Sequence, residues 1–178
     1  FFKMMTSQVA RQFNSRTGIS HVSTADLYYM LGLAAPQLRL GWDSGNSWRE
    51  NRLRLAPFAS ELARVRVAQR NPILIEGELL PETVGYALTE FGAAARGCFI
   101  GSASGTVEAK AQRLRDWREA NGDWLAGKPP ELTEWAAREC VSASVEYREA
   151  AKALGIPYFD LSADFDGGVE AVVEFLAG

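Results

Sequence analysis

The sharpest chemical feature of the sequence is an apolar run that ends in a carboxylate. Residues 72–76 read Pro-Ile-Leu-Ile-Glu, and Gly77 follows Glu76. Such a run is typical of a buried parallel strand, and ligands bind beyond the carboxyl ends of these strands. There the Glu76 carboxylate can hold a magnesium-bound water or orient an attacking hydroxyl. The alternative is a strand terminus with a solvated glutamate.

A second acidic residue, Asp26, lies in residues 21–27, where a strand is expected to pass into a helix. Ser23 or Thr24 caps that helix, and Asp26 falls in its first turn. We therefore expect Asp26 at the same edge of the sheet as Glu76. The structural alternative is that Asp26 only stabilises the helix dipole.

The single histidine, His21, excludes a multi-histidine metal site. Inside a strand, this imidazole is expected to be packed. A hydrolase that pairs His21 with a serine such as Ser23 ranks last among the functions, because the sequence has no G-x-S-x-G elbow.

Basic residues follow a third apolar run. They are Lys110, Arg113, Arg115 and Arg118. Helical spacing places Lys110, Arg113 and Arg118 near one face and points Arg115 elsewhere. Guanidinium groups near a sheet edge suit phosphate oxygens, which accept bidentate contacts. The alternative is a solvated helix face.

Short apolar runs alternate with helical patterns along the chain, which predicts a mostly parallel α/β sheet. Strands are expected at 19–22, 72–76, 97–101 and 157–161, and helices at 52–69, 107–121, 132–154 and 169–176. The polar, turn-rich segment 41–47 is expected to be an exposed loop.

Composition limits the class of protein. The chain has 178 residues, and 19 Lys and Arg against 22 Asp and Glu give a net charge of -3. The length suits one domain, and the charge gives no drive toward nucleic acid or anionic lipid. No apolar run is long enough for a membrane span, and two cysteines are too few for a disulfide scaffold. Without a secretory signal in the sequence, a cytoplasmic protein is expected.

Taken in order, these segments resemble the P-loop kinase-like proteins, a group that includes adenylate-kinase-like and other small-molecule kinases. The resemblance rests on Ser-Thr-Ala-Asp at 23–26, Ile-Glu-Gly at 75–77 and Cys-Phe-Ile-Gly at 98–101 before a basic segment. Residues 123–125 and 155–162 are also similar to this group. The resemblance implies one α/β domain over 1–178: a three-layer, mostly parallel sheet of about four to five strands flanked by helices, with 102–130 as a helical lid.

The resemblance also implies an activity: transfer of the γ-phosphoryl group of ATP, with Mg²⁺, to a small-molecule or nucleotide acceptor. Glu76 and Asp26 would be the catalytic carboxylates, and Ser7 with Glu76 would hold the metal. The nucleotide would contact Ser7, Lys110, Arg113, Arg115 and Arg118, and Asp160 would lie near the adenine.

The sequence departs from this family at its start. The defining G-x-x-x-x-G-K-S/T loop is absent, so that Met5, Thr6 and Ser7 fall where the family has glycine, lysine and the magnesium-binding hydroxyl. These residues cannot curl around a phosphate as the glycine-rich loop does. The chain is either a piece of a longer protein or has lost nucleotide binding. We expect residues 1–5, which are mostly apolar, to form the central strand.

Two functions of different kinds follow. The first is the phosphotransferase, inactive as it stands if the missing phosphate-binding loop is not supplied. The second is a degenerate, non-catalytic domain that serves as a scaffold for a protein partner. Tryptophan is enriched at interaction hot spots, so Trp42, Trp48 and Trp124 are its candidate anchors. The alternative for these tryptophans is ordinary packing.

Overall fold

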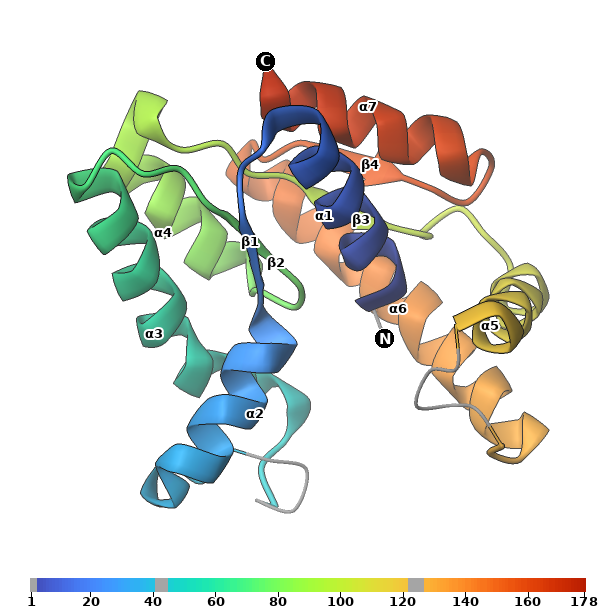
Figure 1. The fold of residues 1–178 in the computed structure, drawn as a ribbon. Helices are drawn as coiled ribbons and strands as arrows, with labels where there is room; N and C mark the ends of the chain where they lie inside the picture. Colours follow the sequence, from blue (N-terminus) through green and yellow to red (C-terminus); the bar gives the residue numbers. More distant parts are fainter. Residues whose placement is uncertain (1–2, 41–44, 122–126) are drawn as a thin grey trace.

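The computed structural model describes residues 3–40, 45–121 and 127–178. Helices make up most of this chain, and short strands connect them (Figure 1). The helices are α1 (Lys3–Thr17), α2 (Thr24–Ala34), α3 (Trp48–Ala68), α4 (Pro81–Phe91), α5 (Val107–Asn121), α6 (Pro130–Leu154) and α7 (Phe165–Ala177). The strands are β1 (His21–Ser23), β2 (Leu74–Glu76), β3 (Phe99–Gly101) and β4 (Tyr158–Asp160).

The strands form two separate sheets rather than one. β1 pairs with β2 in parallel, with Ser23 opposite Glu76, and β3 pairs with β4 in parallel, with Gly101 opposite Asp160. Each strand overlaps a predicted segment. The prediction of a three-layer sheet of four to five strands is nevertheless wrong, because the described residues place no strand between β2 and β3.

The expected central strand at residues 1–5 is also wrong over its described part. Residues 3–5 form the start of α1, and residues 1 and 2 lie outside the described chain. Met5, Val9 and Phe13 are buried and recur every four residues, so they form one helix face. That face belongs to the main core, beside Val169 and other residues of α7. A short apolar run fits a helix as well as a strand, and burial of this face favours the helix.

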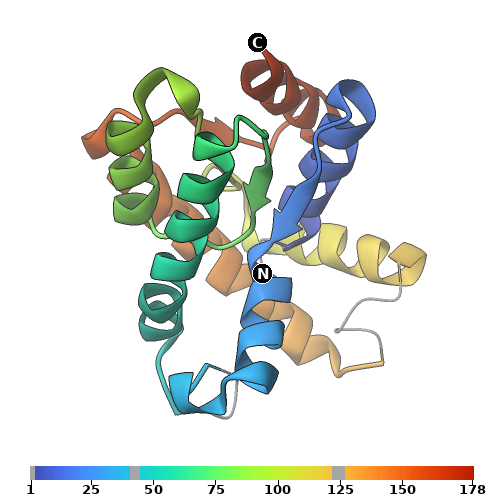
Figure 2. The ribbon, with the colours of Figure 1, turned by 60° about the vertical axis from the view of Figure 1, so that its left-hand side comes forward.

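Helices cover both sides of the two sheets. α1 and α7 pack together on one side (Figure 2). On this side Leu74 and Ile100 join the main core. α3, α4 and α6 lie on the other side, where Phe99 joins a smaller core with Tyr147. Helices therefore pack on both sides of two small, separate parallel sheets.

Local signals explain the helices that place the strands. Ser47 and Glu50 form a capping box at the start of α3. Gly155, in a left-handed conformation, ends α6, as its position after Leu154 predicts. The sequence analysis missed α4, which begins at Pro81 in the first helical turn, where a missing N–H costs nothing.

Within the described ranges, no helix combines the length and the apolar character that crossing a bilayer requires.

Candidate functional site

The carboxyl ends of β1 and β2 lie side by side. Because Ser23 is opposite Glu76 in a parallel pair, the first turn of α2 and the end of β2 meet at one edge. Asp26 lies in that first turn and is exposed, whereas Glu76 is only 7% exposed. The structure therefore places the two predicted carboxylates at the same edge, one at the surface and one beneath it. We call this edge the β1–β2 rim.

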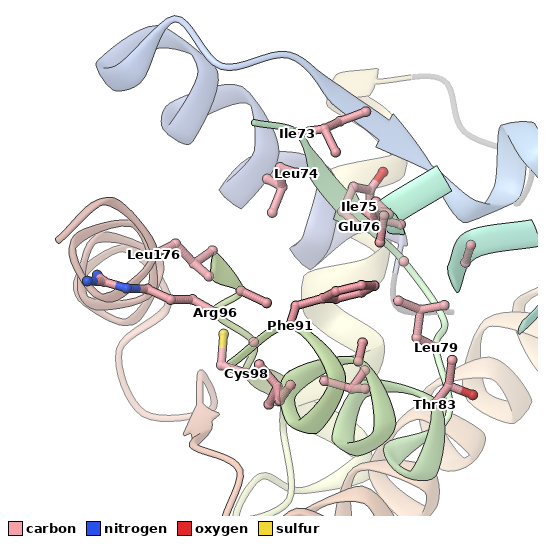
Figure 3. A pocket seen from close by; sticks show the side chains of 18 of the residues that line it. Ile73, Leu74, Ile75, Glu76, Leu79, Thr83, Phe91, Arg96, Cys98 and Leu176 are labelled. Atoms are coloured by element: carbon pink, nitrogen blue, oxygen red, sulfur yellow. The ribbon is translucent and has the colours of Figure 1, made fainter. Parts of the chain in front are cut away.

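Glu76 is the most unusual residue of the β1–β2 rim. Its carboxylate oxygen Oε2 is buried and has no hydrogen-bond partner among the described residues. Glu76 also lines a cavity of about 540 Å³ with Ile75, Cys98 and Phe91 (Figure 3). A buried polar atom without a partner costs free energy, unless a ligand or water supplies the missing bond. Glu76 is therefore available to accept a hydrogen bond.

The turn after β2 holds Glu76 in place. The Thr24 hydroxyl accepts a hydrogen bond from the Glu78 backbone N–H at 3.0 Å. Gly77 has a φ of +121°, and a Cβ at this position would lie 2.2 Å from the Thr24 Oγ1 atom. Only glycine fits both the conformation and the space. The Gly77 backbone thus fixes the exit of β2 against the start of α2.

An ion pair that the sequence analysis did not identify closes one side of the rim. Arg52 of α3 pairs with Glu78 and is 9% exposed. Its guanidinium lies 3.4 Å from the centre of the Trp48 ring and donates to the Trp48 carbonyl. Burial lowers the pKa of Arg52 to about 9. The i, i+4 spacing predicts the contact of Arg52 with Trp48 on one helix, but it does not predict the ion pair with Glu78.

The carboxyl ends of β3 and β4 form a second edge, which we call the β3–β4 rim. Asp160 accepts hydrogen bonds from the backbone N–H groups of Ser104 and Ser162, at 2.8 and 3.0 Å, and from the Ser162 hydroxyl. Burial alone would raise the pKa of Asp160, but the bonds from Ser162 and Ser104 outweigh it and lower that pKa. Asp160 therefore ties the loop after β3 to the loop after β4.

Lys110 is buried in the core instead of facing a ligand. Its side chain is 3% exposed, and its Nζ atom lies 3.6 Å from the Met5 sulfur, a weak acceptor. Burial is the main reason that its pKa is lowered. The nearby charge of Arg113 lowers it further, and Cys140 opposes the shift.

The other basic residues of the segment are held by their neighbours or lie outside the description. Arg113 donates to the carbonyls of Leu161 and Ser162 at 3.0 and 3.4 Å. Arg115 donates to the side chain of Gln112 at 3.0 Å. Arg118 lies in α5, but its side chain is outside the described part. The structure thus gives Arg113 a structural role, and it does not bring the described cations Lys110, Arg113 and Arg115 together around a shared anion site.

The described residues do not fit a magnesium nucleotide. They contain no group of three or more His, Cys, Asp or Glu side chains that could hold a metal ion. Ser7 lies half-buried within α1, two residues after Met5, whose sulfur contacts Ser102 and Lys110. The first turn of α1 thus lacks the glycine-rich curl that cradles a triphosphate.

Searches for similar proteins identify no relative of this chain: no protein-family model, curated protein or solved structure matches it.

Proposed function

We propose that the chain is the acceptor-binding part of a small-molecule phosphotransferase, with the acceptor held at the β1–β2 rim. The observation that carries the proposal is the buried Glu76 oxygen without a hydrogen-bond partner. A hydroxyl of the acceptor would donate a hydrogen bond to this oxygen and satisfy it. A carboxylate in that position orients a hydroxyl for attack and accepts its proton.

Asp26 has a different role in this proposal. It is exposed in the first turn of α2, next to the end of β2. It can contact a second hydroxyl or an amino group of the acceptor, while Glu76 below it binds the reacting hydroxyl. Two carboxylates at different depths would select a ligand that carries several hydrogen-bond donors, such as a nucleoside or a sugar.

ATP and Mg²⁺ have no part in the proposal for this chain, because the described residues do not fit them. When bound, the magnesium nucleotide would supply the phosphoryl group. The rim residues would bind and orient the acceptor whether or not that donor is present. Acceptor binding is therefore measurable with this chain alone.

The test is a thermal-shift and calorimetric screen of nucleosides, sugars and hydroxy acids. We expect at least one of them to raise the Tm of the wild type and not that of Glu76→Gln. Glu131→Gln, in the exposed first turn of α6, is the matched control. If no compound stabilises the wild type, or if Glu76→Gln responds equally, the proposal is wrong. Heat released on addition of Mg-ATP would show that the chain also binds the donor.

The second candidate function is a scaffold for a protein partner. Its proposed tryptophan anchors gain no support: Trp48 is half-buried between Arg52 and Tyr147, and Trp42 and Trp124 lie outside the described residues. A different observation favours it, namely the cavity between the two sheets.

A further inference from the structure

The cavity that contains Glu76 lies where a parallel sheet would have its middle strand. Its walls include residues 73–77 of the β2 segment and residues 97–100 of the β3 segment (Figure 3). Thr6 and Val9 of α1 and Val172 and Leu176 of α7 line one side, and residues of α3 and α4 line the other. Helices thus already cover both faces of an empty strand position.

β2 and β3 run in the same sense on the two sides of this cavity. The segments that enter them, 72–74 and 93–96, share a second cavity with the end of α7. Their carboxyl ends both lie by the first turn of α1: Met5 contacts Ser102, which follows β3, and Thr6 lines the cavity with Glu76. One strand between them would therefore be parallel to both.

The edges of the two sheets that face the cavity carry backbone N–H and C=O groups that can bond to another strand. The Leu74 N–H donates to Ser20, on the β1 side, and the Phe99 N–H donates to Pro157, on the β4 side. Backbone groups of successive strand residues point to opposite sides. Hence Ile75 and Ile100 direct their N–H and C=O groups toward the cavity, which both residues line.

The side chains that line the cavity are mostly apolar, as expected for the neighbours of a central strand in a sheet. Ile73, Ile75 and Ile100 remain only partly buried, although strands between two helical layers are normally buried. Burial raises the pKa of the Cys98 thiol to about 12, so this side chain is a neutral apolar neighbour and not a nucleophile. A strand covering these residues would complete an apolar core.

The charges at the two ends of the cavity are opposite. Arg66, Arg70 and Arg96 line it; Arg70 comes shortly before β2, and Arg96, which donates to the Phe175 carbonyl at 3.1 Å, comes shortly before β3. Glu76, with its unpartnered oxygen, lines it at the end of β2. An occupant parallel to β2 would therefore fit best with an acidic residue at its amino end and a basic residue at its carboxyl end.

We propose that this cavity binds an extended apolar segment of a partner polypeptide, which adds as a parallel strand between β2 and β3 and joins the two sheets. The partner segment has an acidic residue before its apolar run and a basic residue after it. A small apolar ligand would leave the backbone groups of both edges unsatisfied. A second copy is a weaker occupant, because the described strands are already paired and the other apolar segments are helical.

A synthetic peptide tests this proposal on the chain as it exists. The peptide alternates valine and isoleucine, with glutamate at its amino end and lysine at its carboxyl end. We expect one peptide to bind per chain in calorimetry, and the amides of Ile75 and Ile100 to exchange more slowly with solvent when it is bound. The reversed sequence has the same composition and should bind at least about tenfold more weakly.

Two further controls identify the site. A peptide N-methylated at every second residue lacks the donors along one edge and should not bind. Ala63→Trp places an indole in the cavity and should weaken binding by about tenfold or more. Ala68→Trp, on an exposed part of the same helix, should leave it unchanged. If Ala63→Trp unfolds, Glu76→Gln replaces it and should reduce the preference for the forward peptide.

Failure to bind the forward peptide would overturn the proposal, as would equal binding of the reversed or N-methylated peptide. Concentration-dependent dimers that protect Ile75 and Ile100 would show that a second copy fills the cavity instead. None of these results depends on the acceptor, because the small-molecule screen is read without peptide. The two proposals can therefore fail separately.

Discussion

The two rims differ in what they leave available to a ligand. At the β3–β4 rim, Asp160 is bonded to Ser104 and Ser162, and Arg113 to two carbonyls. At the β1–β2 rim, Asp26 is exposed and the buried Glu76 has an oxygen without a partner. Similar strand ends therefore differ: one rim ties two loops together, and the other holds the carboxylates that we propose bind the acceptor.

This contrast shows that position at a strand end is not enough to identify a functional carboxylate. Asp160 and Glu76 both end parallel strands, and Asp160 is the less buried of the two. The difference lies in the loops that follow. The loop after β3 gives its N–H at Ser104 to Asp160, whereas the loop after β2 gives its N–H at Glu78 to Thr24.

The largest expected difference concerns two glycines in the loops that follow β2 and β3. Gly77→Ala would force a left-handed conformation on alanine and a contact of 2.2 Å with Thr24. We expect a loss of about 3 kcal/mol in the free energy of unfolding, measured in urea. Gly105→Ala, in the loop after β3, meets Ser162 at 3.0 Å without that conformation and should cost less than about 1 kcal/mol. Equal costs would mean that the two turns do not differ as described.

Removal of the Asp160 carboxylate should be the next most damaging change. Asp160→Ala leaves the donors of Ser104 and Ser162 without their acceptor, and we expect a loss of about 2 kcal/mol at pH 7. Because the folded pKa of Asp160 is lowered, its stabilisation is present above the unfolded pKa and is lost as the pH falls through the folded value. Urea unfolding from pH 7 to pH 2 should therefore show a smaller difference between the two proteins in acid. A constant difference would contradict this role.

Replacement of the buried lysine should stabilise the protein. Lys110→Met keeps the length of the side chain and removes a buried ammonium group, with an expected gain of about 1 kcal/mol at pH 7. Since burial lowers the pKa of Lys110 in the folded state, the penalty is full below that pKa and disappears as the pH rises toward the unfolded value. The gain should therefore shrink as the pH rises toward about 10 and be absent above it. Destabilisation by Lys110→Met would indicate a polar partner for this lysine.

The smallest expected effect is that of Glu76→Gln without ligand. The amide has almost the same shape, and the carboxylate oxygen that it replaces has no partner to lose. We expect the free energy of unfolding to change by less than about 0.5 kcal/mol. A loss as large as that of Asp160→Ala would show that Glu76 is structural and that the two rims do not differ.

Local sequence patterns predicted much of the fold. Apolar runs beside Gly, Pro and Asn identified the four strands, and the apolar stripe of residues 132–154 identified α6 with its end at Gly155. The apolar pattern at residues 3–5 fits both a strand and a helix, and the helix is favoured because Met5 packs in the core with α7. The helix α4 was missed, although Pro81 and the spacing of Val84, Leu88 and Phe91 indicate it.

The candidate site was only partly predictable. The position of Asp26 and Glu76 at one edge was predicted, because each residue lies where an apolar strand ends. The burial of Lys110 against Met5, 105 residues away, and the pairing of Arg52 with Glu78 depend on tertiary packing, which spacing in the sequence does not reveal. The division into two sheets was not predictable from the strand segments either, because it depends on residues 3–5 forming a helix instead of a strand.

Amide hydrogen exchange in the unbound chain tests the central claim, that each sheet ends in an open edge facing the cavity. Leu74 and Phe99 donate their N–H groups within their sheets, whereas Ile75 and Ile100 face the cavity. We predict that Ile75 exchanges faster than Leu74 and that Ile100 exchanges faster than Phe99. Equal protection of the neighbours in both pairs would contradict the account, because it would mean that both edges are already bonded.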